Sequence, residues 1–186
     1  MNILLIVILF LVLFVYSLKE TFGTFRQIMI WAAVCALSVL VFGNEAISLS
    51  KSEIAAWLAD KSLMKDIGVL VSLEVIANIA FCVTLVVIGN AAPVSRKSVV
   101  LNTVLKYFPG ICIFPAVFYL LTLTIFALPG VDFDLIKYSF SMVVFVCLPL
   151  FSFFLKFILP EKEIRTEILF ISSAVLAMAA TLLSMG

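Results

Sequence analysis

Three polar side chains follow one another at steps of four residues inside a long apolar stretch. Glu74, Asn78 and Cys82 lie within IGVLVSLEVIANIAFCVTLVVIGN, the segment 67–90. Residues four apart share one face of a helix, so these three form a single polar stripe. An acid inside a membrane segment is a candidate functional site, because a carboxylate is costly in hydrocarbon. We take the stripe as a candidate intramembrane polar site that binds a proton or cation, or that seats a basic group of a partner helix. The alternative is a structural role in joining helices.

Other kinds of chemistry find little support in the sequence. The chain has no histidine, the commonest general base and a common metal ligand. Its four cysteines lie in four different apolar segments, and none forms a CxxC pair. The acids at segment ends, among them Glu20, Asp132 and Asp134, are expected to be solvated loop charges. We therefore predict that the protein is not an enzyme, has no metal site and uses no cofactor.

The composition requires lipid as the solvent for most of the chain. Of its 186 residues, 65% are hydrophobic and 12% are charged, and the mean hydropathy is +1.32. Soluble domains are roughly 45–50% apolar and about 25% charged, and a short chain cannot bury such an excess in its own core. The net charge of +1 provides no basic patch for nucleic acid. The expected partner is the lipid bilayer, and no nucleic acid is expected.

Stretches that are almost free of charge divide the chain into six segments long enough to cross a membrane. A spanning helix needs about 20 apolar residues, with a range of roughly 17–25, and a helix satisfies its own backbone in lipid. The sequence therefore predicts an all-α, polytopic membrane protein, a bundle of six transmembrane helices in one integral membrane domain, 1–186. The predicted helices cover 2–18, 27–44, 67–90, 108–128, 137–156 and 168–185.

The first of these segments also resembles the apolar part of a signal peptide. It lacks a basic region before the apolar run, and no A-x-A-like cleavage site follows it. We expect it to remain as a helix of the mature protein. None of the six predicted spans contains Lys or Arg, apart from Lys156 and Lys137 at the two ends of the fifth. Glu74 is therefore expected to lack a cationic partner within the chain.

The stretch after the second predicted span is expected to hold a short helix. Ser50 and Glu53 have the spacing of a capping box ahead of the apolar run IAAWL. This predicts a helix over 51–60, lying on the outer membrane interface with Trp57 as its anchor. The alternative is an ordinary loop helix packed on the bundle.

A second short helix is predicted ahead of the fourth span. Apolar residues recur at steps of four through 97–108, which indicates an amphipathic lead-in on the inner side. Pro109 and Gly110 then interrupt the pattern, and we expect a kink there.

Lys and Arg are distributed unevenly between the two sides of the predicted bundle. Connections after the first, third and fifth helices hold eight of them, and those after the second and fourth hold four. Because loops rich in positive charge stay in the cytoplasm, we expect both termini on the non-cytoplasmic side of the cell (inner) membrane. The eight residues are Lys19, Arg26, Arg96, Lys97, Lys106, Lys156, Lys162 and Arg165.

Side-chain size indicates which helices pack closely and which face outward. The segments 2–18 and 137–156 are rich in Phe, Leu, Ile and Val, and we expect them to face lipid or a partner. Lys156 is expected to extend to the interface as an anchor. Small residues allow close helix contact, and they predict helix-packing seams at Ala32, Ala36, Ala177 and Ala180.

Two functions from different classes follow from these features. The first is a non-enzymatic integral membrane subunit of a larger complex, transport-related or ion-driven, whose partners are other membrane protein subunits. The second is a small, self-contained transporter or a proton- or cation-conducting protein that uses Glu74 and Asn78. Two halves of three helices would lie in opposite orientations, as in inverted-repeat transporters. Apart from Cys35 and Cys147 in equivalent helices, no similarity between the halves supports a repeat.

Overall fold

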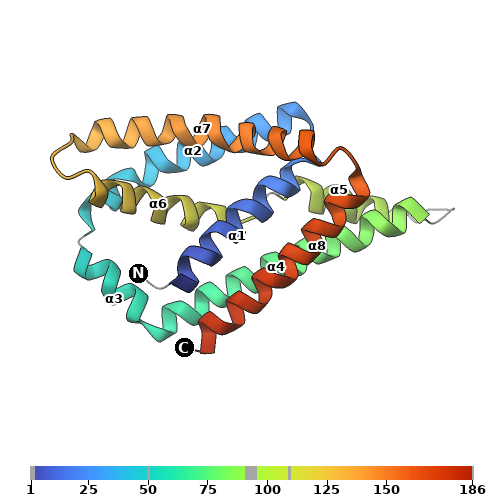
Figure 1. The fold of residues 1–186 in the computed structure, drawn as a ribbon, viewed down its shortest axis with the longest axis horizontal. Helices are drawn as coiled ribbons and strands as arrows, with labels where there is room; N and C mark the ends of the chain where they lie inside the picture. The colour runs from blue at the N-terminus through green and yellow to red at the C-terminus, as the bar shows by residue number, and fades with distance from the viewer. Residues whose placement is uncertain (1–2, 50, 91–95, 109, 186) are drawn as a thin grey trace.

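The structure is a computed structural model that describes residues 3–49, 51–90, 96–108 and 110–185 (Figure 1). The regular elements within these ranges are eight α-helices. They are α1 (Ile3–Glu20), α2 (Phe25–Ser48), α3 (Lys51–Ala59), α4 (Lys61–Asn90), α5 (Arg96–Tyr107), α6 (Ile113–Ala127), α7 (Phe133–Ile158) and α8 (Lys162–Met185). The prediction of an all-helical protein is confirmed.

Four of these helices, α2, α4, α7 and α8, are long and apolar enough to cross a membrane, and α6 is a shorter apolar helix. These helices indicate a membrane protein. Four rather than six helices in the described ranges meet the criteria of length and hydropathy, so the predicted count of six spans is not established. The helices predicted over 51–60 and 97–108 correspond in position to α3 and α5.

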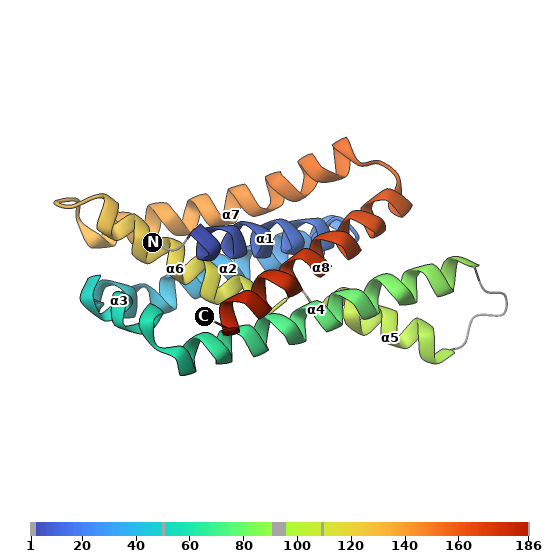
Figure 2. The same cartoon turned by 60° about the horizontal axis from the view of Figure 1, so that its bottom comes forward.

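Two helix pairs form the outer layers of the bundle. α2 packs along α7, and α4 packs along α8, on opposite sides of the molecule (Figures 1 and 2). α1 lies between the pairs and contacts both α7 and α8, while α6 packs mainly on α2. The two largest interfaces are therefore those within the two pairs.

The position of α1 corrects one prediction for the second half of this helix. Its residues Val12, Val15 and Leu18 are almost fully buried in the core, whereas Ile6 and Phe10 in the first half are exposed. The apolar residues of segment 2–18 are needed because α1 is covered from several sides. The expectation fits α7 better, since Leu150 and Phe157 are exposed on its outer face.

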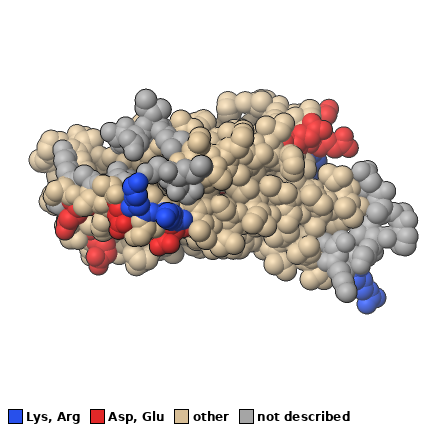
Figure 3. Space-filling view, turned by 90° about the horizontal axis from the view of Figure 1, so that it is seen from below, with Lys and Arg blue, Asp and Glu red and all other residues tan. Residues whose placement is uncertain are grey.

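The bundle has two distinct ends. The chain termini lie at the end that carries α3, and the α1–α2 and α7–α8 connections lie at the end that carries α5 (Figure 1). We call these the α3 end and the α5 end. On the face seen in Figure 3, charged side chains gather toward the two ends, with uncharged surface between them. This distribution is the one that a bilayer requires.

Several helix starts follow from local sequence. Thr24 caps α2, because its side chain accepts a hydrogen bond from the backbone N–H of Gln27. Asp60 precedes α4, and its Oδ1 accepts hydrogen bonds from the backbone N–H and the hydroxyl of Ser62, each at 2.8 Å. These bonds lower the pKa of the Asp60 carboxyl. Ser50, the first residue of the predicted capping box, lies outside the described residues.

The fourth predicted span is divided into two helices. α5 ends at Tyr107 and α6 begins at Ile113, five residues later than the predicted start at 108. Gly110 has a φ of +119°, which interrupts helical geometry; Pro109 lies outside the described residues. With 15 residues, α6 reaches only about 22 Å, less than the ~30 Å of a hydrocarbon core. α5 must supply the rest of any crossing.

Small residues lie at the interfaces of both helix pairs. Ala32 and Ala36 of α2 are buried, and Ser141 of α7 donates a hydrogen bond to the carbonyl of Ala36 at 3.0 Å. On α8, Ala180 is buried and Ala177 is partly buried against the core. These four alanines were the residues expected to form packing seams.

Candidate functional site

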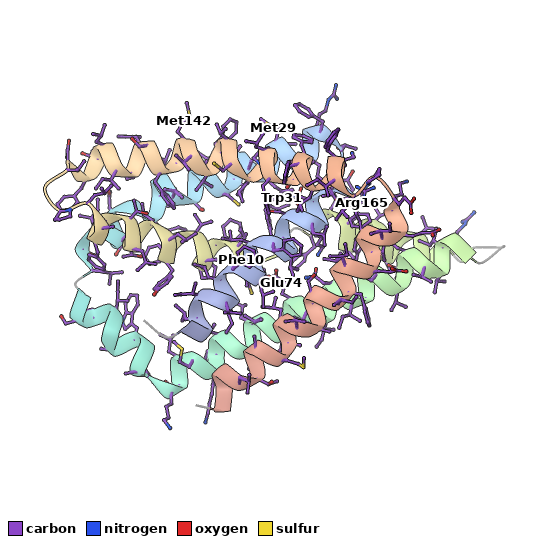
Figure 4. The ribbon with its side chains drawn as sticks, in the orientation of Figure 1. Phe10, Met29, Trp31, Glu74, Met142 and Arg165 are labelled. Atoms are coloured by element: carbon purple, nitrogen blue, oxygen red, sulfur yellow. The ribbon has the colours of Figure 1, made fainter. Side chains whose placement is uncertain are left out.

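Glu74 lies in the middle of the bundle, on the side of α4 that faces α1 (Figure 4). Its side chain is only 4% exposed, and its Oε2 accepts a hydrogen bond of 2.7 Å from the backbone N–H of Cys112. Cys112 is the N-cap residue of α6 and makes no side-chain cap of its own. The carboxyl group therefore satisfies a donor at the start of α6, where the helix dipole favours negative charge.

The connection between α5 and α6 fits around the Glu74 carboxyl. A Cβ at Gly110 would lie 2.5 Å from Oε1 and 2.9 Å from Cδ of Glu74, well inside van der Waals contact. The positive φ of Gly110 is also a conformation that residues with a side chain rarely adopt. Glycine is therefore needed at this position for two reasons, the backbone geometry and the space that the carboxyl group occupies.

Lys19 supplies the cation that we predicted to be absent. It is 3% exposed, and its Nζ lies 5.4 Å from the ring centroid of Phe108 and 5.9 Å from that of Phe81. Its charge interacts with those of Glu74 and Glu20, and its Nζ has no hydrogen-bond partner. The prediction failed because α1 continues to Glu20, past the predicted end at residue 18, and its last turn lies inside the bundle.

Two further charged residues of connecting segments are buried, which corrects their prediction as solvated or cytoplasmic charges. Glu20 is 4% exposed and Arg165 is 3% exposed. Arg165 donates a hydrogen bond of 3.1 Å from Nη1 to the carbonyl of Thr21 and stacks over the ring of Phe22 at 5.2 Å. Glu20 and Arg165 are buried because the C-terminus of α1 packs against α8. Only the position of these charges beside apolar runs could have signalled this burial.

Asn78, one turn after Glu74, lacks partners for its whole amide group. It is 1% exposed, and neither Nδ2 nor Oδ1 makes a hydrogen bond. The hydroxyls of Ser17 on α1 and Ser173 on α8 are also buried without partners. Leaving a buried polar group unpaired costs about 1–3 kcal/mol, so these groups are candidate contacts for a polar species. Sequence reasoning identified Asn78 but neither serine.

Cys82, the third residue of the predicted stripe, is also buried and interacts with the charge of Lys19. Its Sγ donates to the carbonyl of Thr166 on α8 at 3.7 Å. The structure therefore brings together Glu74, Asn78 and Lys19, with Cys82 directed to a neighbouring helix backbone.

An apolar groove of about 340 Å³ leads toward this site from the α3 end. Side chains of α1, α3, α4 and α6 line it, including Trp57 and Tyr119. Val71, one turn before Glu74, and Cys112, the hydrogen-bond donor to Glu74, are among its walls. The groove thus borders on residues next to Glu74, although Glu74 itself is not among its lining residues. Trp57, predicted as an interface anchor, is 46% exposed and forms part of the rim.

Four side chains, Lys19, Phe22, Phe81 and Arg165, pack together toward the α5 end, and we call them the closing cluster. Phe22 meets Phe81 edge to face at 5.4 Å, and the cations of Lys19 and Arg165 lie over these two rings. Cation–π contacts of this kind are strengthened when they are shielded from water. Lys156, the other predicted anchor, lies exposed in the last turn of α7, away from this cluster.

Within the described ranges, no group of three or more His, Cys, Asp or Glu side chains has the arrangement of a metal site. Comparison with protein-family models, with curated proteins and with solved structures finds no match to this chain. The fold indicates an α-helical membrane protein, and its candidate functional site is the buried polar set around Glu74.

Proposed function

We propose that the protein is a small, self-contained, non-enzymatic membrane transporter that binds a proton or cation at Glu74. The observation that carries this proposal is the burial of Glu74, Asn78 and Lys19 in the bundle interior, with an apolar groove toward the α3 end and the closing cluster toward the α5 end. Intramembrane ionisable residues that face a bundle interior mark ion pathways. A site reached from one end and shut from the other is what alternating access requires.

The divided fourth segment supports the same proposal. Transporters commonly build their binding sites from discontinuous helices, whose ends supply backbone groups at mid-membrane depth. Here the break between α5 and α6 lies against Glu74, and the Cys112 N–H at the start of α6 bonds to the carboxylate. We propose that α1 and the α5–α6 pair complete six crossings with the four long helices.

The proposal is tested by reconstituting the purified protein into phospholipid vesicles. Entrapped dyes would report the flux of protons and of alkali cations across the vesicle membrane. Glu74→Gln keeps the size and hydrogen bonding of the side chain but cannot titrate, and we expect it to abolish flux. Glu163→Gln is the control, since Glu163 is an exposed acid in the first turn of α8. Flux of wild-type magnitude in Glu74→Gln would refute a role for this carboxyl in transport.

A subunit of a larger membrane complex, the first function predicted from the sequence, is the second proposal. The feature in its favour is the outer face of α7, where Phe154 and Phe157 are 55% and 85% exposed. Membrane protein subunits would be the partners on this face. Purification in mild detergent tests this, since other proteins in fixed stoichiometry should accompany the chain. A pure monomer with full flux in vesicles would refute it.

The orientation remains a proposal based on positive charge. We propose the cell (inner) membrane, with both termini on the non-cytoplasmic side and the α5 end in the cytoplasm. Burial of Lys19 and Arg165 removes two of the eight charges on which the sequence argument depended. The remaining six still outnumber the four on the other side, and the groove would open toward the non-cytoplasmic side.

A further inference from the structure

The α5–α6 connection is the place where the buried acid and the buried base come together. Glu74 contacts this connection at Gly110 and Cys112, and the Lys19 amine lies 5.4 Å from the ring of Phe108. In this short connection, Phe108 lies near Lys19, and Gly110 and Cys112 contact Glu74. The Lys19 Nζ has no hydrogen-bond partner, so its charge is balanced through space and not by direct contact.

We propose that the species handled at Glu74 is a proton, and that Lys19 supplies the counter-charge of the carboxylate whenever the proton is absent. This inference rests on the proposed function and names its ion. When the proton binds, it forms one O–H bond to the carboxylate, and no other bond forms or breaks. Oε1 is the oxygen that the Cys112 N–H leaves free for it. The Asn78 amide, one turn away, can serve either form, because it offers both a donor and an acceptor.

The surroundings favour a proton over a metal cation. Hard cations are held by several oxygen ligands, whereas Glu74 has one oxygen already engaged and a lysine ammonium nearby that repels a second cation. A proton needs only one oxygen. The other titratable or charged groups around the site, on every element packed near it, are Tyr16, Glu20, Cys82, Lys106, Cys112 and Arg165.

Proton binding at Glu74 also affects the closing cluster, because Lys19 belongs to both the site and the cluster. Its amine interacts with the charge of Glu74 and lies near the ring of Phe81. Neutralising Glu74 leaves the ammonium without its main opposite charge from α4. Protonation therefore weakens the attraction between Lys19 on α1 and the polar stripe of α4.

The test is the labelling of Glu74 by a hydrophobic carbodiimide, which attacks protonated carboxyl groups in an apolar setting. Labelling of the full-length protein in detergent would be followed by peptide mass analysis over a range of pH. Glu74→Gln identifies the signal, because labelled Glu20 would remain in that variant. We expect labelling of Glu74 to fall as pH rises, and to be unaffected by sodium or potassium ions.

The Lys19 variants test the counter-charge. Removing an opposite charge favours the protonated acid, so Lys19→Met should move the labelling midpoint to higher pH, while Lys19→Arg should keep it. An unchanged midpoint in Lys19→Met would overturn the pairing. Protection by an alkali cation would overturn the proton while keeping cation transport. A shifted midpoint without flux in vesicles would support the pair and overturn transport.

Discussion

The Glu74 carboxyl is held in place by the backbone of a neighbouring connection. One oxygen accepts the N–H of Cys112, and the other lies where a side chain at residue 110 would be. Sequence spacing identified Glu74 and Asn78, because an acid within an apolar run needs no structure to be noticed. It could not identify the contacts of Glu74 with Gly110 and with the backbone of Cys112, since these residues lie 36 and 38 positions further along the chain.

Lys19, Glu20 and Arg165 show where sequence reasoning about single residues fails. A charge at the end of an apolar run reaches water only if the helix end reaches the surface. The end of α1 is covered by α4 and α8, so its last two charges are buried. The distance of a residue from the end of an apolar segment can be read from the sequence, but the helices that cover that end cannot.

Gly110→Ala tests how closely the connection fits the carboxyl group. The new Cβ would displace Glu74, and we expect vesicle flux to be lost. Gly130→Ala is a matched control, because Gly130 also has a positive φ, of +94°, but a Cβ there meets nothing within 4 Å. Both changes cost about 1–3 kcal/mol of backbone strain, measured by unfolding in detergent. Equal flux in the two variants would contradict the proposed fit.

At the scale of elements, helix existence was easier to predict than helix length. The segments around α3 and α5 were recognised from capping and amphipathic spacing, and the break at Gly110 from its Pro-Gly sequence. The observed α2, α4 and α8 extend beyond their predicted ranges by several residues at their N-terminal or C-terminal ends. Predicted ends were placed at the first charge, yet a helix continues through charged residues in the interface.

The α2–α7 seam gives a prediction about helix packing. Ala36 is 8% exposed, and its carbonyl receives the hydroxyl of Ser141. Ala36→Leu should destabilise the bundle by about 1–3 kcal/mol, because a larger side chain forces the two helices apart. Val41→Leu enlarges a side chain on the exposed face of the same helix, where Val41 is 68% exposed, and should be nearly neutral. Equal stability of the two variants would contradict close packing at this seam.

For the whole molecule, the sequence predicts a bundle in lipid, whereas the arrangement of its layers needed the structure. Pairing of α2 with α7 and of α4 with α8 depends on contacts between distant segments. The two halves lack sequence similarity, so this pairing carried no signal that a single sequence could show. The central position of α1 likewise depends on contacts between distant segments.

The proposed orientation is tested by reporter fusions. The structure places the termini at the α3 end (Figure 1), and the charge distribution assigns that end to the non-cytoplasmic side. A reporter that is active only in the cytoplasm should give no signal when fused after Gly186. The same reporter fused after Asn90 in a truncated chain should be active. Strong signal from the Gly186 fusion would contradict the orientation.

The central claim is that Lys19 and Glu74 form one buried charge pair, and a double-mutant cycle measures it most directly. The free energy of unfolding in detergent would be compared for wild type, Lys19→Met, Glu74→Gln and the double variant. Each single change removes one member of the pair and leaves the other buried, whereas the double change removes both. We predict that the double variant loses less stability than the two single changes added together, with a coupling energy of about 0.5–3 kcal/mol. Single effects that add to the double effect would contradict the pair.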